Sequence, residues 1–235
     1  MKKLFTYVRQ GNLEEVKRMI TAKPKLLDCV AGPLPKKDHG QSLLQVALKS
    51  GNFDIADYLI DKGINVDFIE KEDDDAGLRA PVLFDAISAA IGSLCINQFS
   101  KPQEIRIKFE RSDRALALLQ KILLKGAGTD KRSSNGISAL SWSLLEAEKI
   151  MRNRDAYPFS QEKVREQLKC IFDLLLEYGA DYKTWAEEGL YPAPCPGPSI
   201  RSIYFDEERS ELGIDYGTVR EMRSFLQSYF RNRGL

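Results

Sequence analysis

The pattern that most constrains this fold is a pair of short apolar periodicities joined by a glycine, within residues 38–67. In the first periodicity, Leu44, Ala47 and Leu48 recur at helical spacing and predict one apolar helix face. A second periodicity of the same kind follows Gly51, and glycine accommodates the tight turn between antiparallel helices. Helices this short are not stable alone in water, so the pair must bury its apolar face against neighbouring pairs.

Variants of this helix pair recur along the chain, and recurrence at such intervals is typical of repeat proteins. An earlier, shortened variant has its glycine turn at Gly11. A third variant runs from Leu83 to a helix-ending glycine at Gly126, and a fourth from Leu140 to Gly179. Both spans are about twice as long as the equivalent span of the second variant, so the third and fourth helix pairs carry inserts.

The two inserts fall near residues 92–111 and 146–162, where each first helix leads into the second. Apolar residues continue at helical spacing into both inserts, so we expect elongated helices. Because the inter-helix turns of such a stack share one side, we expect the inserts to lie side by side. Ser112 and Ser160 are the expected N-caps of the returning helices. The apolar alternation at 105–109 leaves a short strand open as an alternative to a helix.

The segment 38–67 resembles the ankyrin repeat almost position for position. Leu44 and Ala47 fit the Leu-x-x-Ala motif of the first helix, and the Gly-Asn dipeptide at 51–52 fits the turn. Gly63 fits the glycine that ends the second helix. This resemblance implies an all-α fold: an ankyrin-repeat solenoid of about four helix pairs, with elongated helices in repeats three and four.

The resemblance covers residues 1–182, which we expect to form the repeat domain with its inserts. Residues 183–235 are expected to be an extension packed on the same domain. Within it, residues 217–231 predict an amphipathic helix, which would cap the exposed apolar end of the solenoid. Gln45 and Ser141 stand where the family places a histidine, so the hydrogen bonds between the loops that join successive pairs, the finger loops, must be rebuilt.

Composition excludes several classes of protein and of site. Lys plus Arg is 35 and Asp plus Glu is 34, and this balance argues against a protein that grips nucleic acid through phosphates. The cysteines lie far apart and His39 is the one histidine, so we expect no metal site and no cofactor. No apolar stretch approaches the roughly 18 residues of a membrane span, and no signal-peptide hydrophobic region is visible. We therefore expect a cytoplasmic protein that does not bind membranes.

No motif points to catalysis: the glycines form neither a GxGxxG nor a P-loop, and no motif links His39 to a nucleophile. The resemblance implies a protein-interaction module without enzymatic activity, namely an adaptor, inhibitor or targeting protein whose partner is another protein. Degenerate repeats with inserts also resemble effectors that intracellular bacteria deliver, which would act in the host cytosol. The alternative is an enzyme or small-ligand binder with a pocket between the inserts and the carboxy-terminal segment.

The family places partner-binding residues on the concave side, at the finger tips and on the exposed face of each first helix. Carried over to this sequence, these residues are Arg9, Gln10, Lys37, Asp38, Gln41, Lys49, Ser50, Asp73, Asp74, Asp75, Ser88, Ser133, Ser134 and Ile137. The insert surface is an alternative docking site. Basic residues at 106–114 and the acidic run at 70–75 are either solvated faces or a dipolar surface that steers a charged partner.

Overall fold

The structure is a computed structural model that describes residues 2–35, 38–70, 79–97, 99–152, 162–187, 189, 199–205 and 216–233. Across these residues the regular structure is helical, with isolated β-bridges and no strand. The all-α expectation is therefore confirmed for the described part of the chain.

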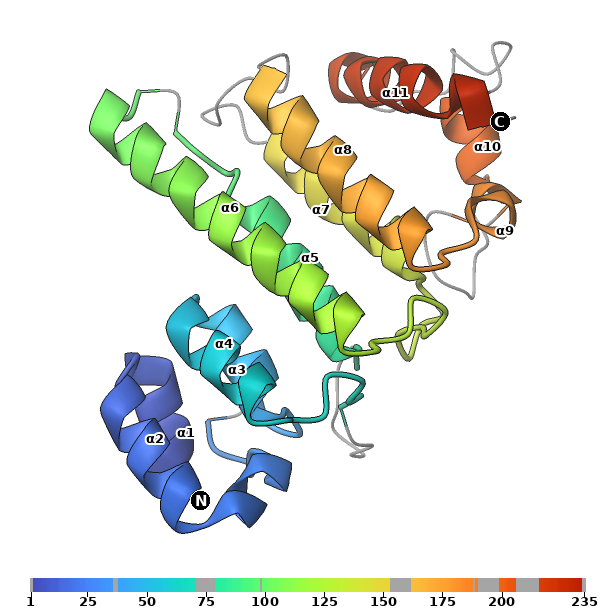
Figure 1. The fold of residues 1–235 in the computed structure, drawn as a ribbon. Helices are drawn as coiled ribbons and strands as arrows, with labels where there is room; N and C mark the ends of the chain where they lie inside the picture. Colours follow the sequence, from blue (N-terminus) through green and yellow to red (C-terminus); the bar gives the residue numbers. More distant parts are fainter. Residues whose placement is uncertain are drawn as a thin grey trace.

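The helices follow one another in antiparallel pairs (Figure 1). Their bounds are α1 (Lys2–Gln10) and α2 (Leu13–Ala22), α3 (Leu43–Lys49) and α4 (Phe53–Asp61), α5 (Val82–Gly92) and α6 (Pro102–Leu124), and α7 (Ala139–Arg152) and α8 (Glu162–Glu177). The first helices pack in one layer, in which α3 contacts α1 and α5, and α5 contacts α7. In the second layer α4 contacts α2 and α6. Figure 1 shows the pairs in a row in chain order.

The glycine turns of the second pair form as the sequence predicts. Gly51 has a φ of +67° between α3 and α4, and Gly63 has a φ of +82° where α4 ends. Glycine enters this left-handed region without the steric cost that a Cβ atom brings. Leu44, Leu83 and Leu140, which mark the first helices, are at most 2% exposed and belong to one hydrophobic core.

Gln45, which stands where the ankyrin repeat carries a histidine, makes hydrogen bonds on both sides of the start of α3. Its side-chain oxygen accepts from the amide of Ser42 at 3.1 Å, which completes a capping box at the start of α3. Its Nε2 donates to the carbonyl of Ala80 in the next finger loop at 3.3 Å. One loop further along, the amide of Ser134 donates to the carbonyl of Arg79 at 2.9 Å. Successive finger loops are thus joined by hydrogen bonds.

The first insert extends α6, which has 23 residues whereas α4 has nine. Residues 105–109 lie inside α6, so the helix alternative is confirmed and the strand alternative is wrong. The expectation that Ser112 is an N-cap is also wrong, because Ser112 is buried within α6 and donates to the carbonyl of Ala90. The helix begins earlier because Lys101 caps it with Glu104, whose carboxylate accepts from the Lys101 amide at 3.2 Å.

The insert lengthens the two helices of the third pair unequally. The first helix, α5, ends at Gly92, so the expected elongation of this helix into the insert at 92–111 is wrong. Asp113 of α6 accepts from Gln167 of α8 and lies 3.6 Å from the ammonium of Lys163, so the second helices meet along their extended parts. Of the second insert, residues 146–152 lie in α7 and residue 162 begins α8. Residues 153–161, which include Ser160, lie outside the described residues.

The carboxy-terminal region contains α9 (Tyr182–Glu187), α10 (Ile200–Tyr204), α11 (Tyr216–Phe230) and a short 3-10 helix (Arg231–Arg233). The predicted helix at 217–231 is therefore present as α11. The ring of Phe172 in α8 has its centroid between 5.8 and 6.3 Å from the rings of Trp185, Phe225, Tyr229 and Phe230. This aromatic cluster joins the carboxy-terminal helices to the last helix pair and covers its apolar surface.

Candidate functional site

The structure distributes the expected partner-binding residues over different degrees of exposure. Gln10, Lys49, Ser50 and Ser134 are exposed, Arg9, Ser88 and Ile137 are half-buried, and Asp38, Gln41 and Ser133 are buried. The remaining four, Lys37, Asp73, Asp74 and Asp75, lie outside the described residues. That any of these residues contacts a partner stays a prediction.

Several of these side chains hold the fold together. The guanidinium of Arg9 lies 2.5 Å from the carboxylate of Asp38, and this ion pair ties the first finger loop to α1. Ser133 accepts from the amide of Ile137 at 3.2 Å, which closes a later finger loop. Ser88 accepts from the indole N–H of Trp142 at 2.8 Å, which joins α5 to α7. The finger-loop surface is thus fixed by hydrogen bonds before any partner arrives.

Lys49 belongs to a polar group that we call the Lys49 cluster, with Gln45, Glu70 and Asp85. The ammonium of Lys49 lies 3.2 Å from Glu70 and 3.5 Å from Asp85. The amide of Gln45 donates to Glu70 at 3.2 Å and to Asp85 at 2.9 Å. The cluster therefore places two carboxylates around one cation and one amide, at the junction of α3, α5 and a finger loop.

Burial governs the electrostatics of the Lys49 cluster. It raises the pKa of Asp85 to about 7, from an ordinary value of 3.8, because the charged carboxylate loses its hydration. The positive charge of Lys49 and the hydrogen bond from Gln45 oppose this shift, and the charge of Glu70 adds to it. Lys49 is among the site residues predicted from the sequence, whereas Asp85 is not. No local signal marks Asp85, which stands within the apolar periodicity of α5.

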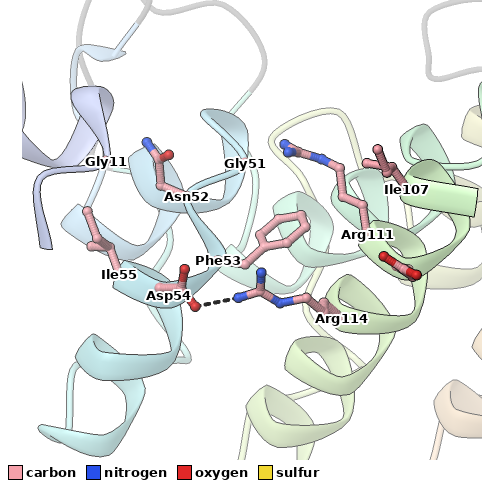
Figure 2. A pocket seen from close by; sticks show the side chains of 10 residues that line it. Gly11, Gly51, Asn52, Phe53, Asp54, Ile55, Ile107, Arg111 and Arg114 are labelled. Atoms are coloured by element: carbon pink, nitrogen blue, oxygen red, sulfur yellow. Dashed lines mark hydrogen bonds and ion pairs between the residues drawn. The ribbon is translucent and has the colours of Figure 1, made fainter. Parts of the chain in front are cut away.

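A hollow of about 290 Å³ lies on the side of the inter-helix turns. Figure 2 shows its walls: the turns at Gly11 and Gly51, the start of α4 at residues 52–55, and residues 107–114 of α6. We call this hollow the turn notch. It forms because α6 extends past the beginning of the much shorter α4.

Arg111 is held in a defined position within the turn notch. Its guanidinium lies 4.9 Å from the centroid of the Phe53 ring, a cation–π contact that orients the flat group. It also lies directly over Gly51, where an added Cβ atom would collide with its terminal nitrogen. Gly51 is therefore required both for its left-handed turn and for the space that Arg111 fills.

The basic residues that follow Arg111 along α6 pair with carboxylates of α4. Arg114 forms an ion pair with Asp54, drawn in Figure 2. Lys121 lies 2.6 Å from both Asp57 and Asp61. These pairs form a ladder between the two helices. No carboxylate in the described ranges pairs with Arg111, because α4 begins at Phe53 and supplies no further acid.

The lining of the turn notch combines charged, polar and apolar groups. Its lining contains guanidinium, carboxylate, amide, aromatic and aliphatic groups, and no serine, cysteine or histidine nucleophile. Within the described segments, no group of three or more His, Cys, Asp or Glu residues could hold a metal ion. The helices described are also too short or too polar to cross a membrane. The notch is bordered by the turns of the first two pairs and by part of the first insert, whereas the pocket predicted for an enzyme would lie between the inserts and the carboxy-terminal segment.

The comparison with known protein families gives a match at the second helix pair. The family model of the ankyrin repeat matches residues 39–68, the segment that contains α3 and α4. This match supports an ankyrin-repeat protein, and ankyrin repeats are in general protein-interaction modules without enzymatic activity. No match was found among curated proteins.

Proposed function

We propose that this chain is a protein-interaction module, an adaptor, inhibitor or targeting protein built as an ankyrin solenoid of about four helix pairs. The observation that carries the proposal is the ankyrin match at residues 39–68, on a helix pair that packs between neighbouring pairs on both sides. The partner is another protein, and the proposed location is the cytosol of the producing cell or of its host.

The finger loops and the exposed ends of the first helices form the proposed docking surface. The hydrogen bond between Ser134 and Arg79 joins two neighbouring finger loops, and the bond between Gln45 and Ala80 ties α3 to one of them. A surface held in this way loses little conformational freedom on docking, which favours affinity. The ammonium of Lys49, whose side chain is 42% exposed, offers such a surface a positive group supported by two carboxylates.

The proposal is tested by capture and then by direct binding. The immobilised chain is used to isolate a partner from the cells that produce it or from their host, and the partner is purified. Its affinity is then measured for the unmodified chain, for Lys49→Gln, and for the matched control Lys125→Gln on the exposed end of the second layer. We expect Lys49→Gln to weaken binding at least about fivefold and the control to change it less than about twofold.

Thermal unfolding of both variants checks that each remains folded. Equal affinities for the two variants would place the docking surface away from Lys49. Failure to isolate any partner from either source would count against the interaction module itself.

A further inference from the structure

We propose that the turn notch binds an acidic side chain of a partner protein, within a segment that carries an apolar residue next to the acid. This inference rests on the proposed interaction function and assigns a second surface, on the side opposite the finger loops, with a stated ligand chemistry.

The first argument is the ladder between α4 and α6. Arg114 and Lys121 each face carboxylates of α4, so their charges are compensated within the fold. Arg111 continues the same row on α6 one turn before Arg114, and within the described ranges no carboxylate forms an ion pair with it. An incoming carboxylate at this position would form the next pair of the ladder.

The second argument is that Arg111 is already placed for this contact. The Phe53 ring supports its guanidinium at 4.9 Å, and the missing side chain of Gly51 leaves room for it. Guanidinium binds carboxylate through two parallel hydrogen bonds, and a guanidinium held in place loses less freedom when those bonds form. Arg111 is an exposed residue, so a ligand has access to this group.

The third argument comes from the amino-terminal end of α4. In the first pair, Asn12 caps α2 by accepting from the amide of Glu15 at 3.2 Å. The equivalent Asn52 donates instead to the carbonyls of Val8 at 2.7 Å and Arg9 at 3.0 Å, and it makes no side-chain cap on α4. The positive end of the α4 dipole therefore faces the notch without a side-chain cap, with Asp54 as the one carboxylate of the first turn, and it favours an anion there.

The fourth argument defines the kind of anion. Asp54 and Glu110 both line the notch, so it contains two carboxylates beside its two guanidinium groups. This balance favours a singly charged carboxylate over a phosphate or a nucleic acid backbone. Ile107, whose residue surface is 53% exposed, adds an apolar contact at the edge of the notch. An acid adjacent to an apolar residue is therefore the segment that fits best.

The experiment measures peptide binding to the full chain. The probe is a fluorescent ten-residue peptide with Asp-Leu-Glu at its centre, and its control has Asn-Leu-Gln there. At about 0.15 M salt, where the charges of exposed groups are screened beyond about 8 Å, we expect the amide peptide to bind about tenfold more weakly. In an NMR titration, the acidic peptide should shift the amide signals of Gly11 and Gly51.

Two variants of α6 locate the contact. Arg111→Gln should weaken the acidic peptide about tenfold, because it removes the charge-assisted pair. The matched control Lys108→Gln removes the same charge from an exposed residue of α6 outside the lining of the notch, and should weaken binding less than about twofold. Thermal unfolding of both variants verifies that they fold.

Several results would overturn the proposal. These are equal binding of the acidic and amide peptides, equal effects of the two variants, displacement of the peptide by inorganic phosphate at similar concentration, or self-association of the chain that depends on Arg111. Failure of the notch proposal can be distinguished from failure of the proposed finger-loop function. A partner lost with Lys49→Gln but retained with Arg111→Gln supports the finger-loop surface and rejects the notch. Peptide binding at the notch without a captured partner supports the notch and counts against the finger-loop surface.

Discussion

The Lys49 cluster and the turn notch both place basic groups beside carboxylates, but they differ in how the charges are compensated. In the Lys49 cluster, two buried carboxylates surround a lysine and the amide of Gln45. In the turn notch, Arg114 is paired with Asp54, while Arg111 lies against an aromatic ring and forms no ion pair with an acid of the described residues. In the Lys49 cluster the charged groups pair with one another, whereas in the turn notch the guanidinium of Arg111 has no ion-pair partner among the described residues.

This difference follows from helix length. The Lys49 cluster lies where α3, α5 and a finger loop meet, so each polar group finds a partner within the protein. The turn notch lies where α6 extends past the start of α4 and leaves part of its inner face uncovered. An insert that lengthens one helix of a stack thus creates a surface that the regular repeat lacks. Four substitutions test this comparison.

The largest effect is expected for Gln45→Met, which keeps the size of a fully buried side chain and removes its hydrogen bonds. Asp85 and the amide of Ser42 would then lose a buried partner. We expect the free energy of unfolding to fall by about 3 kcal/mol in urea denaturation. Gln120→Met, the same change at an exposed position of α6, should have an effect within about 0.5 kcal/mol. Similar losses for the two variants would contradict a closed network around Gln45.

The next effect is a dependence of stability on pH. Because burial raises the pKa of Asp85 to about 7 from 3.8, the folded chain keeps a proton that the unfolded chain has released between these values. The free energy of unfolding should therefore fall as pH rises from about 4 to about 7, by about 3 kcal/mol. Asp85→Asn should remove this part of the pH dependence, as measured by urea denaturation across that range.

Asp57→Asn is the control for this titration, since Asp57 is an exposed member of the ladder. Asp57→Asn should show the same fall in the free energy of unfolding between pH 4 and 7 as the unmodified chain. Its curve should be displaced from that of the unmodified chain by a constant of less than about 1 kcal/mol. The assignment to Asp85 is wrong if its asparagine variant shows the same pH profile as the unmodified chain.

A smaller effect is expected for Gly51→Ala, which tests the wall of the notch. A Cβ atom at a φ of +67° is strained, and it would displace the guanidinium of Arg111. We expect a loss of about 1–2 kcal/mol in the free energy of unfolding. Gly92→Ala, at an exposed helical glycine with free space around it, should be neutral or stabilising by up to about 1 kcal/mol. Thermal denaturation of the two variants separates these outcomes.

The smallest effect is expected for Arg111→Met. It removes an exposed cation–π contact, so the free energy of unfolding should fall by less than about 1 kcal/mol. Arg111→Met and Gln45→Met both replace a long polar side chain by methionine. Their losses in the free energy of unfolding therefore compare the turn notch and the Lys49 cluster directly. A loss at Arg111 as large as that at Gln45 would mean that Arg111 serves the fold and is not held open for a ligand.

The local features of the fold could be read from the sequence. Gly51 and Gly63 adopt the left-handed conformations that their positions predict, and the helix predicted at 217–231 is present. These features depend on residues close in the chain. The expected N-cap Ser112 was wrong because a serine is compatible with a cap or with a buried helix position, and packing against Ala90 favours the latter.

The candidate site was less predictable. Lys49 stood among the expected residues and Glu70 belonged to the acidic run at 70–75, but their contact and the partner Asp85 were not predicted, because no local pattern links them. The basic residues of the first insert were recognised as a charged group. That Arg111 differs from Arg114 was not, since both are arginines on the same helix. Only the position of α4 beside α6 distinguishes them.

The sequence by itself determined where helices turn, which residues are apolar enough to be buried, and that residues 39–68 match an ankyrin repeat. Those properties arise from short-range periodicity and from glycine's freedom at φ values that other residues avoid. The tertiary structure alone decided which charges are compensated. Arg114 and Asp54 are far apart in the chain, and their pairing depends on how far two packed helices overlap. The overlap of α4 with α6 ends before Arg111, so no carboxylate of α4 forms an ion pair with its guanidinium.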